Sequence, residues 1–440
     1  MTTFITDKQT TDELGLLGRY QPGSAYGLFN KARTNGGQRL MEEMLRHPLT
    51  EAPAINQRTD IFRYFQQKAY PFPLDGEVVN AFSNMLDSGC SKTRLGNLLS
   101  TYQKKLLASV VHDDRYHRQH TGVQLATGLL RELHGFLSGK NAGLGAHPYE
   151  ERMQAIQVIL SDKRIERLRN LADKQTITPN DIAWYDHLLK HSLRRDMETV
   201  LQFIYELDVY IAVSEVARDK GFCYAVAVNE RGNLLDIKNL RHPALDKGVG
   251  NDLSLDSNRN LLFLTGANMA GKSTLMKSTG IALYLAHAGF PVAADEMFFT
   301  IKDGLYSSIN VPDNINLGYS HFYAEVLRVK SAAELVSGGK NMLVMFDELF
   351  KGTNVKDAYE GTLEVARAFA RYTNCLFIIS THIIEVGEAL KGNGHILFGY
   401  MPTIMEGGRP KYPYRLTEGI TEDRQGMIII QNEGIPELLK

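Results

Sequence analysis

The sequence is poor in cysteine, in long apolar runs and in net charge, and each shortage excludes a class of protein. Its three cysteines, Cys90, Cys223 and Cys375, have neither paired nor metal-type spacing, which argues against a disulfide or zinc scaffold and suits a reducing compartment. No apolar run approaches the roughly 18 residues that span a bilayer, and the polar N-terminus MTTFITDKQTTDE has no secretory core. We therefore expect a cytoplasmic protein without a membrane partner. The net charge of -1 gives no bulk attraction for nucleic acid, so any contact with DNA must come from local basic faces.

The composition that remains is that of a globular protein with more than one domain. With 43% hydrophobic and 22% charged residues, a chain of 440 residues is too long for one ordinary core. We predict a helical core over residues 1–105, long helices over 106–220, and an α/β domain over 221–440. In this last region apolar strand-like runs alternate with helices, which is typical of a mostly parallel sheet.

Helical periodicity dominates the first half. Arg33–Leu49 predicts a turn at Asn35-Gly36-Gly37 that leads into an amphipathic helix. The longest predicted helix covers Asp181–Asp219, and we expect it to pack against Glu150–Ala172 as an antiparallel pair of long arms. The seam of the first arm consists of Leu193, Met197, Val200, Ile204, Leu207 and Ile211.

Basic residues on these arms leave two interpretations open. They alternate with acidic residues, so they form either a solvated face with ion pairs at helical spacing or a face that contacts phosphates. The residues concerned are Lys163, Arg164, Arg167, Arg169, Lys190, Arg194 and Arg195.

The most specific stretch is Leu261–Thr274, LLFLTGANMAGKST, in which an apolar run is followed by a match to G-x-x-x-x-G-K-[ST]. Gly266 and Gly271 let the backbone turn so that successive N–H groups face a phosphate chain. Lys272 can reach the β- and γ-phosphates, and the Ser273 hydroxyl can ligate Mg²⁺. The alternative is a chance match in a glycine-rich turn, but the apolar strand before it and the apolar helix after it are the context that the motif requires. We predict that the phosphates of a nucleotide are bound by Gly266, Ala267, Asn268, Met269, Ala270, Gly271, Lys272, Ser273 and Thr274.

Two later strands also end in polar residues. Met342–Phe346 is followed by Asp347 and Glu348, and we predict that Asp347 holds Mg²⁺ while Glu348 orients the attacking water. An ordinary strand end with acidic residues is the alternative. Cys375–Ser380 leads to His382, which we predict senses the γ-phosphate, although a lone histidine is more often an ordinary surface or core residue.

Together these residues resemble the DNA mismatch-repair MutS family, of the ABC-type ATPase superfamily. NDLSLDSNRNLLFLTGANMAGKSTLMK resembles its phosphate-loop block, which usually has Pro and Gly where this chain has Ala267 and Ala270. NLGYSHFYAEV resembles its composite-site signature, with His321 in place of a Thr. FDELFKGTNVKDAYEG, STHIIEV, LDIKNLRHPALDK and YPYRLTEGITEDRQGMIIIQNEGIP resemble further blocks of the ATPase domain, and TNGGQRLMEEMLRHPL and LDVYIAVSEVA resemble segments of the core-and-lever domain.

The resemblance implies an α/β P-loop (ABC-type) ATPase domain preceded by an all-α core and lever domain. It implies that ATP and Mg²⁺ are the cofactors, that Lys272, Glu348 and His382 are catalytic, and that Ser273 and Asp347 hold the metal. Two ATPase domains would face one another in an ATP-dependent homodimer, with Ser320 of one subunit completing the ATP site of the other. Asn268 would lie near the γ-phosphate and Asn251 near the adenine.

The departures from the family narrow the expected role. The chain begins where the lever domain begins, so we expect the mismatch-recognition and connector domains to be missing. Mismatch readers use a Phe-x-Glu motif, and its only occurrence here is Phe346-Asp-Glu348, which is already assigned to the ATPase strand. We also expect a short C-terminal extension and little room for a DNA-gripping clamp.

Three roles remain open. The first is a DNA-associated ATPase that binds branched or damaged DNA, in repair or recombination, without reading mismatches. The second is an ATP-switched protein-interaction module, and the third is a nucleotide-binding structural protein with negligible turnover. The pair Asp347-Glu348 argues against the third.

Overall fold

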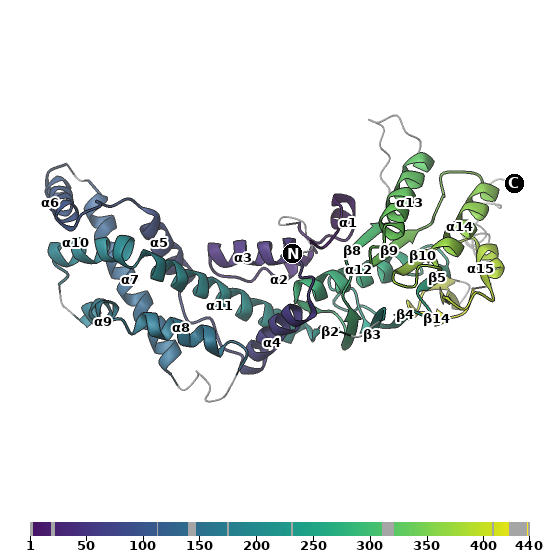
Figure 1. Cartoon of the computed structure of the whole chain (residues 1–440), viewed down its shortest axis with the longest axis horizontal. Coiled ribbons are helices and arrows are strands. Elements are labelled where there is room, and N and C mark those ends of the chain that lie inside the picture. Colours follow the sequence, from purple (N-terminus) through teal and green to yellow (C-terminus); the bar gives the residue numbers. More distant parts are fainter. Residues whose placement is uncertain are drawn as a thin grey trace. The chain divides into compact units, whose positions relative to one another are not determined.

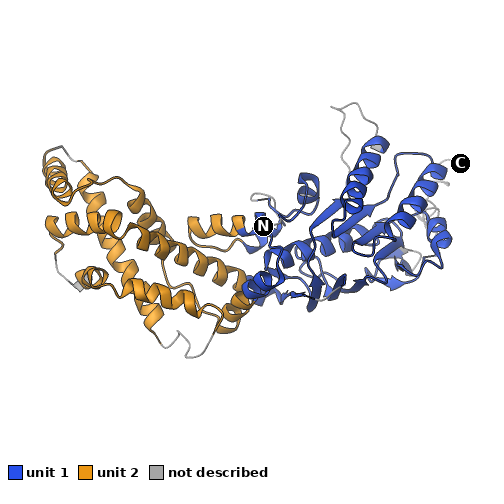
Figure 2. Cartoon of the chain, viewed as in Figure 1, with its two compact units in different colours: residues 1–29, 44–59, 216–440 blue, residues 30–43, 60–215 orange. Residues whose placement is uncertain are grey.

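The computed structural model describes residues 3–18, 23–111, 113–139, 147–173, 176–229, 232–309, 321–406, 409–421 and 438. The chain forms two compact units: unit 1 (residues 1–29, 44–59 and 216–440) and unit 2 (residues 30–43 and 60–215), shown in different colours in Figure 2. The predicted three-part division at residues 105 and 220 stays a prediction. Among the residues described, every helix is too short or too polar to cross a bilayer.

The boundaries between the units fall directly after Phe29 and inside α3, α4 and α11, and unit 2 is formed by helical elements (Figure 1). These elements are α3 (Asn35–Arg46), α4 (Ala52–Lys68), α5 (Gly76–Asp87), α6 (Arg94–Val111), α7 (Arg115–Ser138), α8 (Glu150–Leu160), α9 (Lys163–Arg169), the 3-10 turn η1 (Asn170–Asp173), α10 (Pro179–His187), the π turn η2 (Leu188–Ser192) and α11 (Arg194–Lys220).

The core of unit 2 is built on the predicted seam. All six seam residues are buried, five of them in α11 and Leu193 directly before it. The helices α8 and α9 contribute the buried residues Met153, Ile156, Leu160, Ile165 and Leu168. The prediction of uninterrupted arms is wrong, however. The N–H of Leu193 donates to Leu188 O at 2.9 Å, which closes a wide π turn between α10 and α11. The second arm ends at Ser161, and the carboxylate of Asp162 accepts from the N–H of Arg164 at 2.7 Å to start α9 as a new helix.

The predicted turn at Asn35-Gly36-Gly37 is instead the first turn of α3. The carboxylate of Asp208 accepts hydrogen bonds from the N–H groups of Arg33 and Thr34, at 3.0 and 2.8 Å, and fixes the start of the helix. Glycine is needed here for close packing, because a Cβ at Gly36 would lie 2.2 Å from the ring of Tyr205. The amphipathic pattern of α3 is confirmed, with Met41 and Leu45 fully buried.

Several basic residues of the arms form ion pairs. Arg164 pairs with Asp162 at 2.7 Å, and Arg194 pairs with Glu198 at 2.6 Å and with Asp87 at 2.9 Å. The interpretation of ion pairs at helical spacing is confirmed for Arg194, which is four residues from Glu198, whereas Arg164 pairs with the N-cap residue of its own helix. Such exposed pairs contribute little to stability, because water and salt screen them.

Unit 1 combines strands with helices (Figure 1). Its helices are α1 (Lys8–Glu13), α2 (Ala25–Phe29), α12 (Lys272–Ala288), α13 (His321–Ser337), α14 (Val355–Phe369) and α15 (Ile384–Leu390). Its strands are β1 (Cys223–Tyr224), β2 (Val226–Val228), β3 (Leu234–Leu240), β4 (Asn251–Asp256), β5 (Leu261–Gly266), β6 (Pro291–Val292), β7 (Glu296–Thr300), β8 (Gly304–Ser308), β9 (Met342–Asp347), β10 (Leu376–Ser380), β11 (Ile396–Met401), β12 (Ile404–Glu406), β13 (Arg409–Lys411) and β14 (Thr417–Glu418).

The main sheet has six strands in the order β14-β11-β5-β10-β9-β8, and all its neighbours are parallel except the edge strand β14. A four-stranded mixed sheet has the order β2-β7-β3-β4, and β1-β6 and β12-β13 form two-stranded pairs. The sequence prediction of an α/β region with a mostly parallel sheet is therefore confirmed for unit 1.

Helices cover both faces of the main sheet. Alternate strand residues, such as Phe263, Val344 and Phe377, form one apolar cluster with α13, α14 and α15. The opposite face meets the buried helix α12, where a Cβ at Gly280 would lie 2.6 Å from Cε of Met345. Strands buried on both faces must be apolar throughout, which explains why β5, β9 and β10 appear in the sequence as continuous hydrophobic runs.

Candidate functional site

The candidate site lies at the carboxyl edge of the main sheet, where three parallel strands end. β10 lies between β5 and β9, and its last residue, Ser380, is paired with Leu264 on one side and with Asp347 on the other. The loop after β5 and the acidic residues at the end of β9 are therefore close in space, although about 75 residues separate them in the sequence. Ligands of open α/β sheets bind at this edge.

The loop between β5 and α12 needs glycine at both glycine positions of the G-x-x-x-x-G-K-[ST] motif, because of the backbone conformation and the space available there. Gly266 has φ = 139° and Gly271 has φ = 106°, values that favour glycine. A Cβ at Gly266 would lie 2.8 Å from the carbonyl oxygen of Met401, and one at Gly271 would lie 3.1 Å from the ring of Tyr414. Because α12 begins at Lys272, its unpaired first-turn N–H groups and the positive end of its dipole are at the loop.

Lys272 is held inside this loop. Its side chain is buried, and Nζ donates to the carbonyl oxygens of Gly266 at 2.8 Å and Ala267 at 3.3 Å. Burial lowers the pKa of Lys272, and the carboxylates of Glu348 and Asp347 act in the opposite direction. The ammonium group is thus placed between the loop and the two acidic residues.

Ser273 and Asp347 are in direct contact. The Ser273 hydroxyl donates to Oδ2 of Asp347 at 2.5 Å, and the Ser380 hydroxyl donates to Oδ1 of the same carboxylate. The carboxylate of Asp347 is therefore oriented by hydroxyl groups from the neighbouring strand and from α12.

Glu348 and His382 face one another across the ends of β9 and β10. Nδ1 of His382 lies 3.8 Å from Oε1 of Glu348. This interaction lowers the pKa of Glu348 and raises the pKa of His382. Partial burial acts against both shifts, because it disfavours the charged form of each group. The backbone of Glu348 has φ = 54°, which is strained for a residue with a side chain, and its N–H donates to Ser380 O at 2.9 Å.

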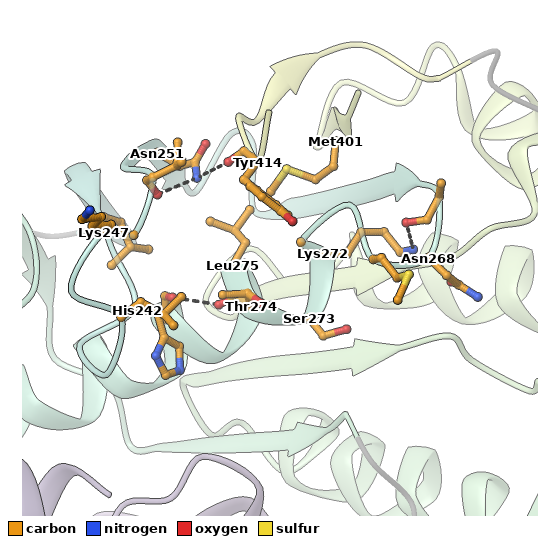
Figure 3. Close-up of a pocket in the computed structure, with 18 of the residues that line it drawn as sticks. His242, Lys247, Asn251, Asn268, Lys272, Ser273, Thr274, Leu275, Met401 and Tyr414 are labelled. Carbon is orange, nitrogen blue, oxygen red and sulfur yellow. Dashed lines mark hydrogen bonds between the residues drawn. The ribbon is translucent and has the colours of Figure 1, made fainter. Parts of the chain in front are cut away.

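These residues border a cavity of about 510 Å³ (Figure 3). Its walls include most of the predicted ATP-binding residues and Glu348, whereas Gly266, Ala270, Asp347 and His382 lie beside the cavity and are not part of its lining. Ser320 lies outside the described residues. The predicted residues in the lining are Asn251, Ala267, Asn268, Met269, Gly271, Lys272, Ser273, Thr274 and Glu348.

The cavity is also lined by residues that were not among the predicted site residues. Figure 3 shows Tyr414, His242, Lys247 and Met401 around it, and Leu240 also belongs to its lining. Their segments lie far from the glycine-rich loop in the sequence, so no motif spacing connects them to it. The available signal was the resemblance of two segments to blocks of the family's ATPase domain. LDIKNLRHPALDK contains Leu240, His242 and Lys247, and YPYRLTEG contains Tyr414.

Asn251 lines the cavity, but its amide group is already engaged. Nδ2 donates to the carbonyl oxygen of Tyr414 at 3.0 Å, and Oδ1 accepts from the N–H of Leu416 at 2.6 Å. Asn251 therefore joins the start of β4 to the segment that carries Tyr414 and fixes one wall of the cavity (Figure 3).

The donor set at the end of β9 fits Mg²⁺. This ion prefers oxygen ligands and is usually held by one or two carboxylates together with water and substrate phosphates. Ser273 and Asp347 offer a hydroxyl and a carboxylate oxygen 2.5 Å apart. No group of three His, Cys, Asp or Glu side chains that could hold a metal by itself occurs in the described part of the chain, so phosphate oxygens would have to complete the coordination.

Comparison with known proteins gives an independent result for the same region. The family model described as MutS domain V matches residues 262–439. This range contains the glycine-rich loop, Asp347, Glu348, His382 and Tyr414, and it begins after Asn251.

Curated relatives extend the similarity toward the N-terminus. The DNA mismatch repair protein MutS of Pseudothermotoga lettingae is 29% identical over 239 residues, which are 53% of this chain and 29% of the relative. The proteins of the same name from Listeria innocua and Bacillus cytotoxicus are 26% and 25% identical and cover 66% and 74% of this chain. The matched regions are 36% and 38% of those two relatives, so this chain spans about a third of the length of the curated relatives it matches. The family model over residues 262–439 and these relatives together show that this chain is similar to proteins of the MutS family.

Proposed function

We propose that this protein binds ATP in the cavity at the carboxyl edge of the main sheet and hydrolyses it with the help of Mg²⁺. The observation that carries this proposal is the convergence of Lys272, Ser273 and Glu348 on one cavity of about 510 Å³, with Asp347 bonded to Ser273 behind it. A cation, a hydroxyl and two carboxylates at a helix N-terminus suit phosphoryl transfer to water.

Each side chain has a separate task in this proposal. Lys272 and the N–H groups of the loop attract the phosphates, and Ser273 and Asp347 hold Mg²⁺, which neutralises phosphate charge that the nearby carboxylates would otherwise repel. Glu348 orients a water molecule and accepts its proton as the water attacks. His382 lies beside Glu348, so it would keep that carboxylate in place and contact the γ-phosphate of the bound ATP.

The adenosine part would lie where Tyr414 lines the cavity. The ring of Tyr414 is next to Gly271 and offers an aromatic surface to the base, and His242 and Leu240 also belong to the lining. Burial lowers the pKa of His242, which favours a neutral imidazole beside an uncharged base. Asn251 supports this part of the lining through its hydrogen bonds to the backbone at Tyr414 and Leu416.

Removal of the metal tests the reaction. Phosphate release from ATP by the purified chain should require Mg²⁺ and fall to the buffer rate when excess EDTA is added, because the carboxylates would repel an uncompensated polyphosphate. Radiolabelled ATP and a colorimetric phosphate assay measure this directly. Equal release with Mg²⁺ and with EDTA would contradict the proposed role of Ser273 and Asp347.

We propose further that a second copy of the chain completes the site. The similarity to the family's composite-site signature around Ser320 supports this arrangement, and ATP would then favour a homodimer. The oligomeric state of the chain with and without a slowly hydrolysed ATP analogue, measured by sedimentation velocity, reports on it.

We propose association with DNA as the role of the ATPase. The matched relatives are named for DNA mismatch repair, and unit 2 contains a basic hollow of about 1080 Å³. Two of its basic side chains already form ion pairs, Lys190 with Asp186 and Arg115 with Asp113. The basic side chains in the lining are Lys104, Arg115, His117, Arg118 and Lys190.

Salt dependence distinguishes this role from that of a protein-interaction module. Fluorescence anisotropy with labelled duplex, mismatched and branched DNA should show binding that weakens about 10- to 40-fold between 50 and 200 mM salt, as two or three phosphate contacts require. Arg118→Ala should reduce the affinity, whereas Lys356→Ala on α14 should not. Binding to none of these DNAs at 50 mM salt would exclude the role and favour the alternative module.

A further inference from the structure

Helix α6 packs with its polar side inward and its apolar side outward. Asn97 and Thr101 are fully buried, whereas Leu95 is 75% and Leu99 is 71% exposed. The main apolar cluster of unit 2, as far as the described residues go, contains no side chain from α6. This is the reverse of the usual arrangement, in which a helix buries its apolar face against the core.

A buried polar network fixes this orientation. Nδ2 of Asn97 donates to Ala183 O at 2.8 Å and to the carboxylate of Asp186 at 3.2 Å. Gln119 donates to the same carboxylate at 2.9 Å, and Lys190 pairs with it at 2.6 Å. Asp186 is only 1% exposed, so turning α6 to bury its leucines would remove a partner from a buried carboxylate, which is costly.

The outward residues form a narrow stripe along the helix. They are spaced four, three, four and four residues apart, so at 3.6 residues per turn they fall within about 80° of the helix circumference. A stripe of this width is typical of a coiled-coil seam, whereas helices that cover a core or lie on a lipid surface use a wider apolar face. The stripe consists of Leu95, Leu99, Tyr102, Leu106 and Val110, which are 75%, 71%, 46%, 66% and 70% exposed.

The charges of α6 indicate which kind of helix would fit. Its sequence, RLGNLLSTYQKKLLASVV, contains Arg94, Lys104 and Lys105 and no acidic residue. Arg94 and Lys105 are exposed and lie to one side of the stripe. A second copy packed antiparallel on this stripe would bring the basic flanks of the two helices to the same side of the pair, and the like charges would repel.

We propose that the outward face of α6 is a docking surface for an amphipathic helix of a partner protein, whose apolar seam is flanked by acidic residues. The helix would insert its apolar side chains along the α6 stripe, and its Asp or Glu residues would pair with Arg94 and Lys105. This proposal uses no part of the ATP site.

Two synthetic helical peptides test it. Both carry leucines spaced four, three, four and four residues apart, and the flanking positions are glutamate in one and lysine in the other. In anisotropy titrations with the full chain, the glutamate-flanked peptide should bind at least ~10-fold more tightly than the lysine-flanked one, a difference of about 1.4 kcal/mol. Its affinity should also fall at high salt.

Variants of the exposed residues connect the binding to this face. L99S combined with L106S should weaken the glutamate-flanked peptide at least ~10-fold without changing the melting temperature, because both side chains are largely exposed. Lys105→Glu should reduce or abolish the preference between the peptides, because Arg94 would then be balanced by a carboxylate on the same flank. Val158→Ser is the matched control, since Val158 on α8 is 74% exposed and should leave binding unchanged.

The proposal would be overturned if the two peptides bind equally, if neither binds, or if L99S with L106S leaves the binding unchanged. Self-association that this double variant abolishes would instead assign the face to a second copy. Binding to vesicles of phosphatidylserine and phosphatidylcholine that the double variant abolishes would assign it to a lipid surface.

Discussion

Glu348→Gln is expected to lower the turnover number for ATP at least ~100-fold, the range in which a positioned general base contributes, while ATP binding stays nearly unchanged. Glutamine preserves the length of the side chain and its ability to accept a hydrogen bond. It removes the negative charge that orients the attacking water and accepts its proton. The backbone should keep its position, because the N–H of residue 348 is held by Ser380 O.

Single-turnover hydrolysis and equilibrium binding of a fluorescent ATP analogue separate the two effects. Glu364→Gln on α14 is the matched control, since Glu364 is exposed and belongs to no part of the cavity lining. Turnover that stays at the wild-type rate in Glu348→Gln would remove Glu348 from the catalytic role.

Lys272→Met is expected to weaken ATP binding about 100-fold or more. The lysine supplies a charge-assisted contact to phosphate, worth about 1.5–3 kcal/mol, in a partly desolvated site where charge interactions are stronger than in water. Methionine fills much of the same volume, so the loop loses a charge and gains no large cavity. The carbonyl oxygens of Gly266 and Ala267 would lose the donor they have now, which predicts a small fall in the melting temperature as well.

Isothermal titration with ATP and Mg²⁺ measures this loss. Lys340→Met, at an exposed position after α13, controls for the removal of one positive charge. A folded Lys272→Met protein that binds ATP with wild-type affinity would show that the cavity does not hold the phosphates at this loop.

The parts of the site that adjoin one another in the sequence could be predicted, because their spacing is determined by local geometry. A strand, a turn that needs glycine and a helix start follow one another between Leu261 and Lys272, and the structure places them as predicted. The acidic pair after β9 was predicted for a similar reason, since a buried run followed by charge marks the end of a strand. The roles assigned to these residues stay predictions.

The remaining walls depend on which strands become neighbours. Tyr414 reaches the cavity because its segment is joined to the start of β4 through Asn251, a contact between residues that lie 163 positions apart. No periodicity in the sequence encodes that distance. Leu188–Ser192 posed a different problem, because it contains neither glycine nor proline, so the pattern gave no reason to expect a π turn there.

The hydrogen bonds of Lys272 have a consequence for the proposed binding of phosphate. Its ammonium group donates to two backbone carbonyl groups of its own loop. If ATP binds here as proposed, phosphate oxygens must replace these carbonyl groups as partners of the lysine. The measured affinity would then reflect the difference between two hydrogen-bonded arrangements of Lys272, and not the full strength of the contact between lysine and phosphate.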